Sequence, residues 1–153
     1  MVLNRQKRVR VKLRALDEFL QRAAALLLLP HDAATICLVT DAKIAEWNRA
    51  YRGKNRPTDV LSFPAVVHAQ NGNGKIARSP GHIRASQEIY LGDVAIAPAV
   101  ARRNARAAGR GFDEEMQVLA LHGLLHLMGY DHESDNGAME RLEARLRRKL
   151  GIT

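Results

Sequence analysis

The sequence predicts one α+β domain, close to an α/β fold, that spans residues 1–153 and is built around a small mixed sheet. A chain of this length can bury one ordinary hydrophobic core and is too short for two. Segments with the helical period alternate with short apolar segments, which indicates about four mostly parallel strands packed with five or so helices. Hydrophobic residues make up 46% of the chain and charged residues 26%, as in folded proteins rather than disordered ones.

Two helices and two strands are expected in the first 64 residues. Apolar side chains recur at intervals of three and four from Val9 to Leu29, which predicts a helix with one buried face. Ala34 to Val39 is apolar, partly β-branched and short, and is therefore expected to be a buried strand. Asp41 is the expected N-cap of a second helix, which Gly53 ends. A basic turn then leads to a strand from Asp59 to Pro64, where proline ends the pairing.

The second half begins with a segment of no clear period. Ala65 to Gln87 is rich in turn residues, which predicts a long, mobile and variable loop, or an irregular hairpin. Strand character returns from Glu88 to Ala97, and a helix follows from Pro98 to about Ala108. Asp113 is expected to cap a helix that continues to Met128. A last amphipathic helix is predicted from about Ser134 to Leu150.

The charge of the chain is consistent with an anionic partner. Lysine and arginine number 24 against 16 acidic residues, so the formal net charge is +8. Such a field attracts polyanions, of which nucleic acid is the commonest, although many basic domains bind none. The charge therefore favours a nucleic-acid substrate only if a suitable site accompanies it.

Cysteine content and hydropathy limit the other possibilities. Cys37 is the only cysteine, which excludes an internal disulfide and a cysteine-based zinc site, and its apolar neighbours predict a buried, inert thiol. The longest apolar run, Ala23 to Pro30, is far shorter than a membrane span. The N-terminal residues lack the apolar core of a signal peptide. We expect a cytoplasmic protein without a membrane partner.

Three histidines form the strongest candidate for a chemical site. His122 and His126 are four residues apart on a predicted helix, so they project from the same face and can bind one ion. Gly129 can adopt the left-handed backbone that ends a helix and can bring His132 to the open side of the metal. Three imidazoles leave one position of a tetrahedral Zn²⁺ open to water, whose pKa zinc can lower to about 7. The pattern therefore predicts a hydrolytic site with one zinc ion per chain.

The same spacing occurs in the metzincin proteases, which carry a glutamate directly after the first histidine. Here that position is Gly123, so the side chain that takes a proton from the zinc-bound water of a protease is missing. A peptidase is therefore the weaker hypothesis. The other histidines, His31, His68 and His82, stand alone in predicted loops and are not expected to bind the metal.

Three strings of residues resemble one known family. The run from His122 to His132, His-Gly-Leu-Leu-His-Leu-Met-Gly-Tyr-Asp-His, resembles the signature of the YbeY family, bacterial metal-dependent endoribonucleases of ribosomal RNA maturation. The run from Asn48 to Pro64 resembles that family's arginine loop and following strand, and the run from Leu91 to Val94 resembles a later strand. The matched segments, with the C-terminal helix, follow the family's order and cover most of the chain.

The resemblance implies a metzincin-like site in which His122, His126 and His132 bind zinc and Arg52 is needed for activity. A guanidinium suits that role because it can hold a phosphate through two parallel hydrogen bonds and offset the charge that develops during attack.

Three nearby residues are candidates for supporting roles. Lys54 and Arg56 can extend the binding of the substrate, and a solvated basic turn is the alternative for both. Asp131 either orients a ligand imidazole or shapes the turn between the histidines. The sequence does not assign the general base.

The function implied by the resemblance is a zinc-dependent, single-strand-preferring endoribonuclease that matures the 3′ end of small-subunit ribosomal RNA and acts in ribosome quality control. The expected partners are ribosomal RNA, the small subunit and ribosome-assembly proteins, and no DNA or membrane partner is expected. Two alternatives stay open: a zinc-dependent peptidase-like hydrolase, and a non-catalytic ribosome-assembly factor whose zinc only stabilises the fold.

Overall fold

The computed structural model describes residues 1–70, 76–80, 82–83, 89–131 and 134–152, with only backbone pairing described for the strands between 66 and 83. The elements in chain order are β1 (Val2–Asn4), α1 (Leu13–Leu26), β2 (Ala34–Leu38), α2 (Asp41–Arg52), β3 (Val60–Pro64), β4 (Val66–Gln70), β5 (Ile76–Pro80), β6 (His82–Ile83), β7 (Ile89–Tyr90), β8 (Gly92–Ile96), α3 (Pro98–Ala108), α4 (Phe112–Leu127) and α5 (Ala138–Leu150). Helices and strands alternate as far as β3; the remaining described strands then follow one another, and three helices end the chain.

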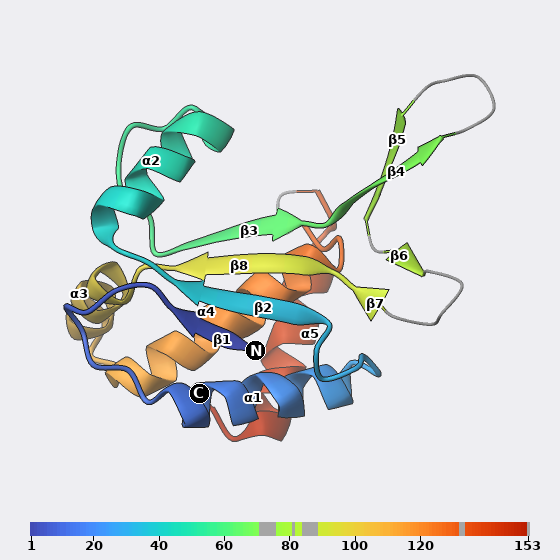
Figure 1. Ribbon diagram of the computed structural model, residues 1–153. Coiled ribbons are helices and arrows are strands. Elements are labelled where there is room, and N and C mark those ends of the chain that lie inside the picture. The colour runs from blue at the N-terminus through green and yellow to red at the C-terminus, as the bar shows by residue number, and fades with distance from the viewer. Residues whose placement is uncertain (71–75, 81, 84–88, 132–133, 153) are drawn as a thin grey trace.

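Four strands form the central sheet in the order β1-β2-β8-β3 (Figure 1). Strands β1, β2 and β8 are parallel, with Asn4, Leu38 and Ile96 in register at their carboxyl ends, and β3 pairs antiparallel with β8 at the edge. This arrangement confirms the predicted mixed, mostly parallel sheet of about four strands, and the described part of the chain contains five helices. Of the four strands in this sheet, only β1 has no counterpart among the predicted strands.

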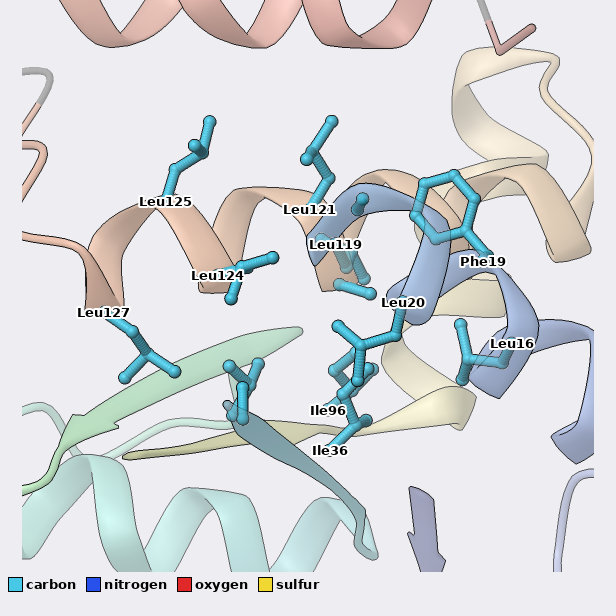
Figure 2. Packing of buried hydrophobic residues seen from close by; sticks show 14 of the residues in the cluster. Leu16, Phe19, Leu20, Ile36, Ile96, Leu119, Leu121, Leu124, Leu125 and Leu127 are labelled. Atoms are coloured by element: carbon cyan, nitrogen blue, oxygen red, sulfur yellow. The ribbon is translucent and has the colours of Figure 1, made fainter. Parts of the chain in front are cut away.

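The main core lies between one face of the sheet and helices α1, α4 and α5 (Figures 1 and 2). Helix α4 is apolar on most sides because it runs through the middle of this layer. Figure 2 shows Leu127 pointing toward the sheet, while Leu121 and Leu125 point away from it toward α5. A helix that is packed on both sides cannot shift without losing contacts. Its few polar side chains are therefore held on a rigid support.

The opposite face of the sheet is covered only in part, by α2 at one end (Figure 1). A second, smaller core lies there. Its buried members are Val39, Ile44, Leu61, Ala95, Ala97 and Val100. The aromatic side chains Trp47 and Phe63 border this core and mark where the covered part of the face ends.

Two helices begin later than the apolar period suggests. Helix α1 starts at Leu13 rather than Val9, because the buried side-chain amide of Gln6 donates to the carbonyl oxygen of Val9 and accepts from its N–H, both at 2.9 Å. These two bonds hold the preceding segment in a turn. Helix α5 starts at Ala138 rather than near Ser134, since the residues between them form turns.

The predicted N-caps are also displaced. Thr40, not Asp41, caps α2, because the Thr40 hydroxyl accepts a hydrogen bond from a first-turn backbone N–H while Asp41 is already helical. Gly111 occupies the N-cap of α4, and Asp113 lies within its first turn. In both helices the carboxylate is nevertheless close to the positive end of the helix dipole, where it is favourable.

The predicted loop between Ala65 and Gln87 contains paired strands, which corresponds to its irregular-hairpin alternative. Strand β4 pairs antiparallel with β5, and β6 pairs antiparallel with β7; residues 71–75, 81 and 84–88 lie outside the described part. The predicted strand that follows is divided into β7 and β8. Gly92 opens β8 with φ of +138°, and a Cβ atom there would overlap the carbonyl oxygen of Phe63, so only glycine fits.

Two other expectations concern the burial of Cys37 and the apolar length of the helices. Cys37 is half-buried rather than buried, because its side chain points to the partly covered face of the sheet. Burial raises the pKa of the Cys37 thiol, while Arg5 lowers it and Asp93 raises it further. None of the helices in the described ranges is both long enough and apolar enough to cross a membrane.

Candidate active site

The site begins with two imidazoles on one face of α4. His122 and His126 lie one turn apart, and their rings are 4.5 Å apart between centroids in an edge-to-face arrangement. The Nε2 atoms of the two rings face each other at 3.0 Å. Both side chains are half-buried, so they border solvent while their backbone is fixed by the core.

The second ring nitrogen of each histidine has a partner that accepts a hydrogen bond. Nδ1 of His126 lies 3.0 Å from the carbonyl oxygen of Tyr130, and Nδ1 of His122 lies 3.4 Å from Oε2 of Glu143 on α5. A carbonyl oxygen or a carboxylate can only accept, so Nδ1 is the donor in each ring, which in a neutral imidazole leaves the lone pair on Nε2. Two lone pairs that converge in this way fit a cation between them.

The geometry of this pair fits a divalent metal. Two nitrogens that are each about 2.0–2.1 Å from a tetrahedral zinc lie about 3.3 Å apart, close to the observed 3.0 Å. The third predicted ligand, His132, lies outside the described residues, and within the described ranges no three histidine, cysteine or acidic side chains gather around one point. Gly129 has φ of +97°, the left-handed turn predicted to redirect the chain after the helix. The three-histidine site therefore stays a prediction.

Glu143 is a site residue that the sequence analysis missed. Its side chain is only 16% exposed, and it lies four residues after Met139, a buried residue on the apolar face of α5. An acidic residue on the inward face of an amphipathic helix was the available signal. Its partner could not be identified because α4 and α5 are brought together only by the fold.

Arg52 reaches the same cleft from a different helix. A cleft of about 470 Å³ is lined by Arg52 at the C-terminal end of α2, by residues of β3 and its approach, and by His122, His126 and Asp131. Seventy residues separate Arg52 from His122 in the sequence, and the structure brings the guanidinium side chain and the two imidazoles to the same cleft.

The turn after Arg52 is held by a buried side chain. Asn48 is 1% exposed, and its side-chain Nδ2 donates to the carbonyl oxygen of Arg56 at 2.9 Å, while its main-chain carbonyl oxygen accepts from the N–H of Lys54 at 3.3 Å. Gly53 ends α2 in the left-handed conformation, with φ of +67°. These contacts fix where the chain leaves the helix and therefore where Arg52 begins to reach into the cleft.

The supporting residues lie at different distances from the cleft. Lys54 and Arg56 are exposed and are not among the residues that line the cleft, so their role in binding substrate stays a prediction. Asp131 does line the cleft, and its Oδ2 accepts from the hydroxyl of Ser134 at 3.3 Å. Asp59 supplies a second carboxylate to the cleft, and its Oδ2 accepts from Nδ2 of Asn104 at 3.3 Å.

Position 123 cannot supply a side chain to the cleft. A Cβ atom there would lie 2.5 Å from Cγ1 of Val94, so the residue faces strand β8 at close range. The Gly123 carbonyl oxygen accepts a hydrogen bond from Ser62 of β3 at 3.1 Å, which ties the helix to the edge strand. The glycine is therefore a packing requirement of this fold, and the protease glutamate has no place at this position.

The remaining histidines lie elsewhere. His31 borders a shallow hollow beside Asp17 and the N-terminus, away from the residues that line the cleft. His68 belongs to β4 and His82 to β6, and their side chains are outside the description.

The fold and cleft together define a small α+β protein in which a histidine pair from one helix faces an arginine from another across the edge strand of the sheet. A family model described as "Endoribonuclease YbeY" matches residues 1–151. The chain therefore belongs to the YbeY family.

Individual relatives agree with this assignment. The chain is 35% identical over 152 residues to "Endoribonuclease YbeY" of Koribacter versatilis (strain Ellin345), covering 99% of this chain and 86% of that protein. It is 37% identical over 125 residues to the protein of the same name from Nautilia profundicola, covering 82% and 77%. The solution structure of TM1509 from Thermotoga maritima is similar with a TM-score of 0.61 and 26% identity, covering 98% of this chain and 89% of that one.

Proposed function

We propose that this protein is a zinc-dependent endoribonuclease that cleaves single-stranded RNA at the 3′ end of small-subunit ribosomal RNA, in ribosome maturation and quality control. The observation that carries the proposal is the convergence of two imidazole Nε2 atoms, 3.0 Å apart, in the cleft that Arg52 also lines. The name that the family and its members carry supports the endoribonuclease activity.

His122, His126 and His132 are the proposed ligands of one Zn²⁺. When bound, such an ion polarises the phosphate and lowers the pKa of a water molecule. The chain's own contribution is orientation: the carbonyl of Tyr130 and the carboxylate of Glu143 keep the hydrogens on Nδ1 and turn both Nε2 atoms to one point. Nickel or copper would also suit three imidazoles by affinity, so the metal has to be identified by elemental analysis.

Arg52 is the proposed phosphate-binding residue. Its guanidinium can donate two parallel hydrogen bonds to the phosphate oxygens and offset the negative charge that increases during attack. It enters the cleft from α2, whereas the imidazoles enter from α4, so the phosphate would be held from two sides. Asp59 and Asp131 also line this cleft, and their carboxylates are the proposed candidates to accept a proton from the attacking group.

The net charge of +8 supports RNA as the substrate, with the small subunit and ribosome-assembly proteins as proposed partners. A peptidase is disfavoured because position 123 faces β8 instead of the cleft. A non-catalytic assembly factor is the alternative that the experiment must separate.

The test combines metal analysis with RNA cleavage. Purified protein should contain about one zinc ion per chain, and it should cleave a single-stranded RNA faster than the same sequence in a duplex. His126→Ala should remove both the metal and the cleavage. Arg52→Ala should keep the metal but reduce the rate by about 100- to 1,000-fold. Cleavage that persists in His126→Ala would contradict the metal mechanism, and normal ribosomal RNA ends in cells carrying Arg52→Ala would favour the assembly factor.

A further inference from the structure

A second hollow lies on the other face of the sheet, beyond β3 from the cleft. It has a volume of about 400 Å³, and its lining includes Trp47, Tyr51, Phe63, Cys37 and Asp93. The ring of Phe63 has edge-to-face contacts with Trp47, at 5.6 Å between centroids, and with Tyr51, at 5.2 Å. Tyr51 is nevertheless 71% exposed, so much of its ring meets solvent. An exposed aromatic ring that is buttressed by a second ring is a surface suited to stacking.

The hollow and the cleft lie on opposite faces of the edge strand β3. Tyr51 and Arg52 are consecutive residues of α2, and consecutive helical residues point in directions about 100° apart. Ser62 and Phe63 are consecutive residues of β3, and consecutive strand residues point to opposite faces. Arg52 and Ser62 accordingly line the cleft, while Tyr51 and Phe63 line the hollow. A ligand that is held at Arg52 has only to cross the edge strand to reach the rings.

The polar groups of the hollow decide which part of a nucleic acid can enter it. Asp93 is exposed at its wall, where one carboxylate oxygen accepts from the hydroxyl of Tyr90, whose oxygen in turn accepts from the hydroxyl of Thr35. A carboxylate repels a phosphate group but accepts hydrogen bonds from the amino groups of a base. The hollow therefore suits a nucleobase, and the arginine on the cleft side suits the backbone.

We propose that the Tyr51–Phe63 hollow stacks one unpaired base of the RNA strand whose phosphate is bound at Arg52. The inference rests on the proposed function and adds to it a physical reason for the preference for single strands, because a paired base cannot leave its stack to enter the hollow. Base–aromatic stacking tolerates any base, and loss of one such contact weakens binding by about tenfold. Asp93 adds a preference for a base with an amino group over uracil.

The hollow contains its own reporters, because Trp47 is the only tryptophan and Cys37 the only cysteine of the chain. The probe is a short single-stranded 2′-O-methyl RNA, in which no free 2′-hydroxyl can attack the adjacent phosphate. Its binding should quench the fluorescence of Trp47 and slow the alkylation of Cys37. A series of the same oligonucleotide can carry one abasic site at each position in turn. The member that lacks the base bound in the hollow should lose both effects, and the other members should keep them.

Two substitutions at position 51 separate stacking from folding. Tyr51→Leu should raise KM for a cleavable single-stranded RNA about tenfold with little change in kcat, whereas Tyr51→Phe, which keeps the ring, should behave as the wild type. Melting curves serve as the check that both variants are folded.

The outcomes distinguish this inference from the function on which it rests. If the wild type cleaves RNA while Tyr51→Leu has an unchanged KM and neither Trp47 nor Cys37 responds to the oligonucleotide, base stacking is overturned and the endoribonuclease stands. The exposed face with Tyr51 and Phe63 would then be better explained as a contact surface for a protein partner. If the oligonucleotide protects Cys37 and quenches Trp47 but no RNA is cleaved, the base site stands and the proposed reaction fails.

Discussion

Gly123→Ala should destabilise this protein, although alanine is normally the better residue in a helix by about 1 kcal/mol. The added Cβ would lie 2.5 Å from Cγ1 and 2.9 Å from Cγ2 of Val94, a strand residue that is 1% exposed. Overpacking of a closed core costs about 1–3 kcal/mol, and contact with both methyl groups places this case near the upper end. The net loss in the free energy of unfolding should be about 2 kcal/mol.

Thermal melting followed by circular dichroism measures the effect. For a domain of this size, a loss of about 2 kcal/mol lowers Tm by roughly 4–8 °C. The control is the same substitution in a Val94→Ala background, where the space is open and the helix preference of alanine should make Gly123→Ala neutral or stabilising. The double-mutant cycle should therefore give a coupling energy of about 2 kcal/mol or more between positions 94 and 123.

A wild-type Tm in the single variant, or the same loss in both backgrounds, would refute the packing argument. The site provides a second readout, because displacing α4 from β3 strains the bond between Ser62 and the Gly123 carbonyl and moves both histidines relative to Arg52. RNA cleavage should accordingly fall in Gly123→Ala even at temperatures where the variant is folded.

Three further predictions concern single side chains. Glu143→Gln should weaken metal binding about 10- to 100-fold, measured in competition with a chelator, because His122 loses its anionic partner. The control is Glu140→Gln on the exposed side of α5, which should bind the metal as the wild type does. Equal affinities of the two variants would exclude the Glu143 carboxylate from this role. Arg52→Lys should recover only part of the activity lost in Arg52→Ala, because an ammonium lacks the two-pronged geometry, and Arg49→Ala should be neutral; full recovery would show that charge alone suffices. Alkylation of Cys37 in the native protein should be slower than in the unfolded chain at pH 8.5 and should rise toward higher pH, because the raised pKa leaves less thiolate at a given pH; an equal rate would contradict the burial of the thiol.

The elements that could be predicted from sequence are those whose pattern repeats locally. The apolar residues and end signals of the five described helices, and the short apolar runs of β2, β3 and β8, locate these elements to within a few residues. Strand β1 is only three residues long, Val2–Asn4, and no period can be read from so few; it is a strand because β2 offers it a parallel partner. The pairing of β4 with β5 is also decided between segments and not within one.

The features of the candidate site also separate into those that follow from local sequence and those that depend on contacts between distant segments. The sequence by itself determined the histidine pair, because four residues on a helix make one turn and the distance between His122 and His126 follows from local geometry. Only the tertiary structure decided that Arg52 shares their cleft, that Glu143 stands behind one imidazole and that position 123 faces the sheet. These contacts join segments that are far apart in the chain, and no periodic pattern encodes them; they depend on how the helices pack against β3 and β8.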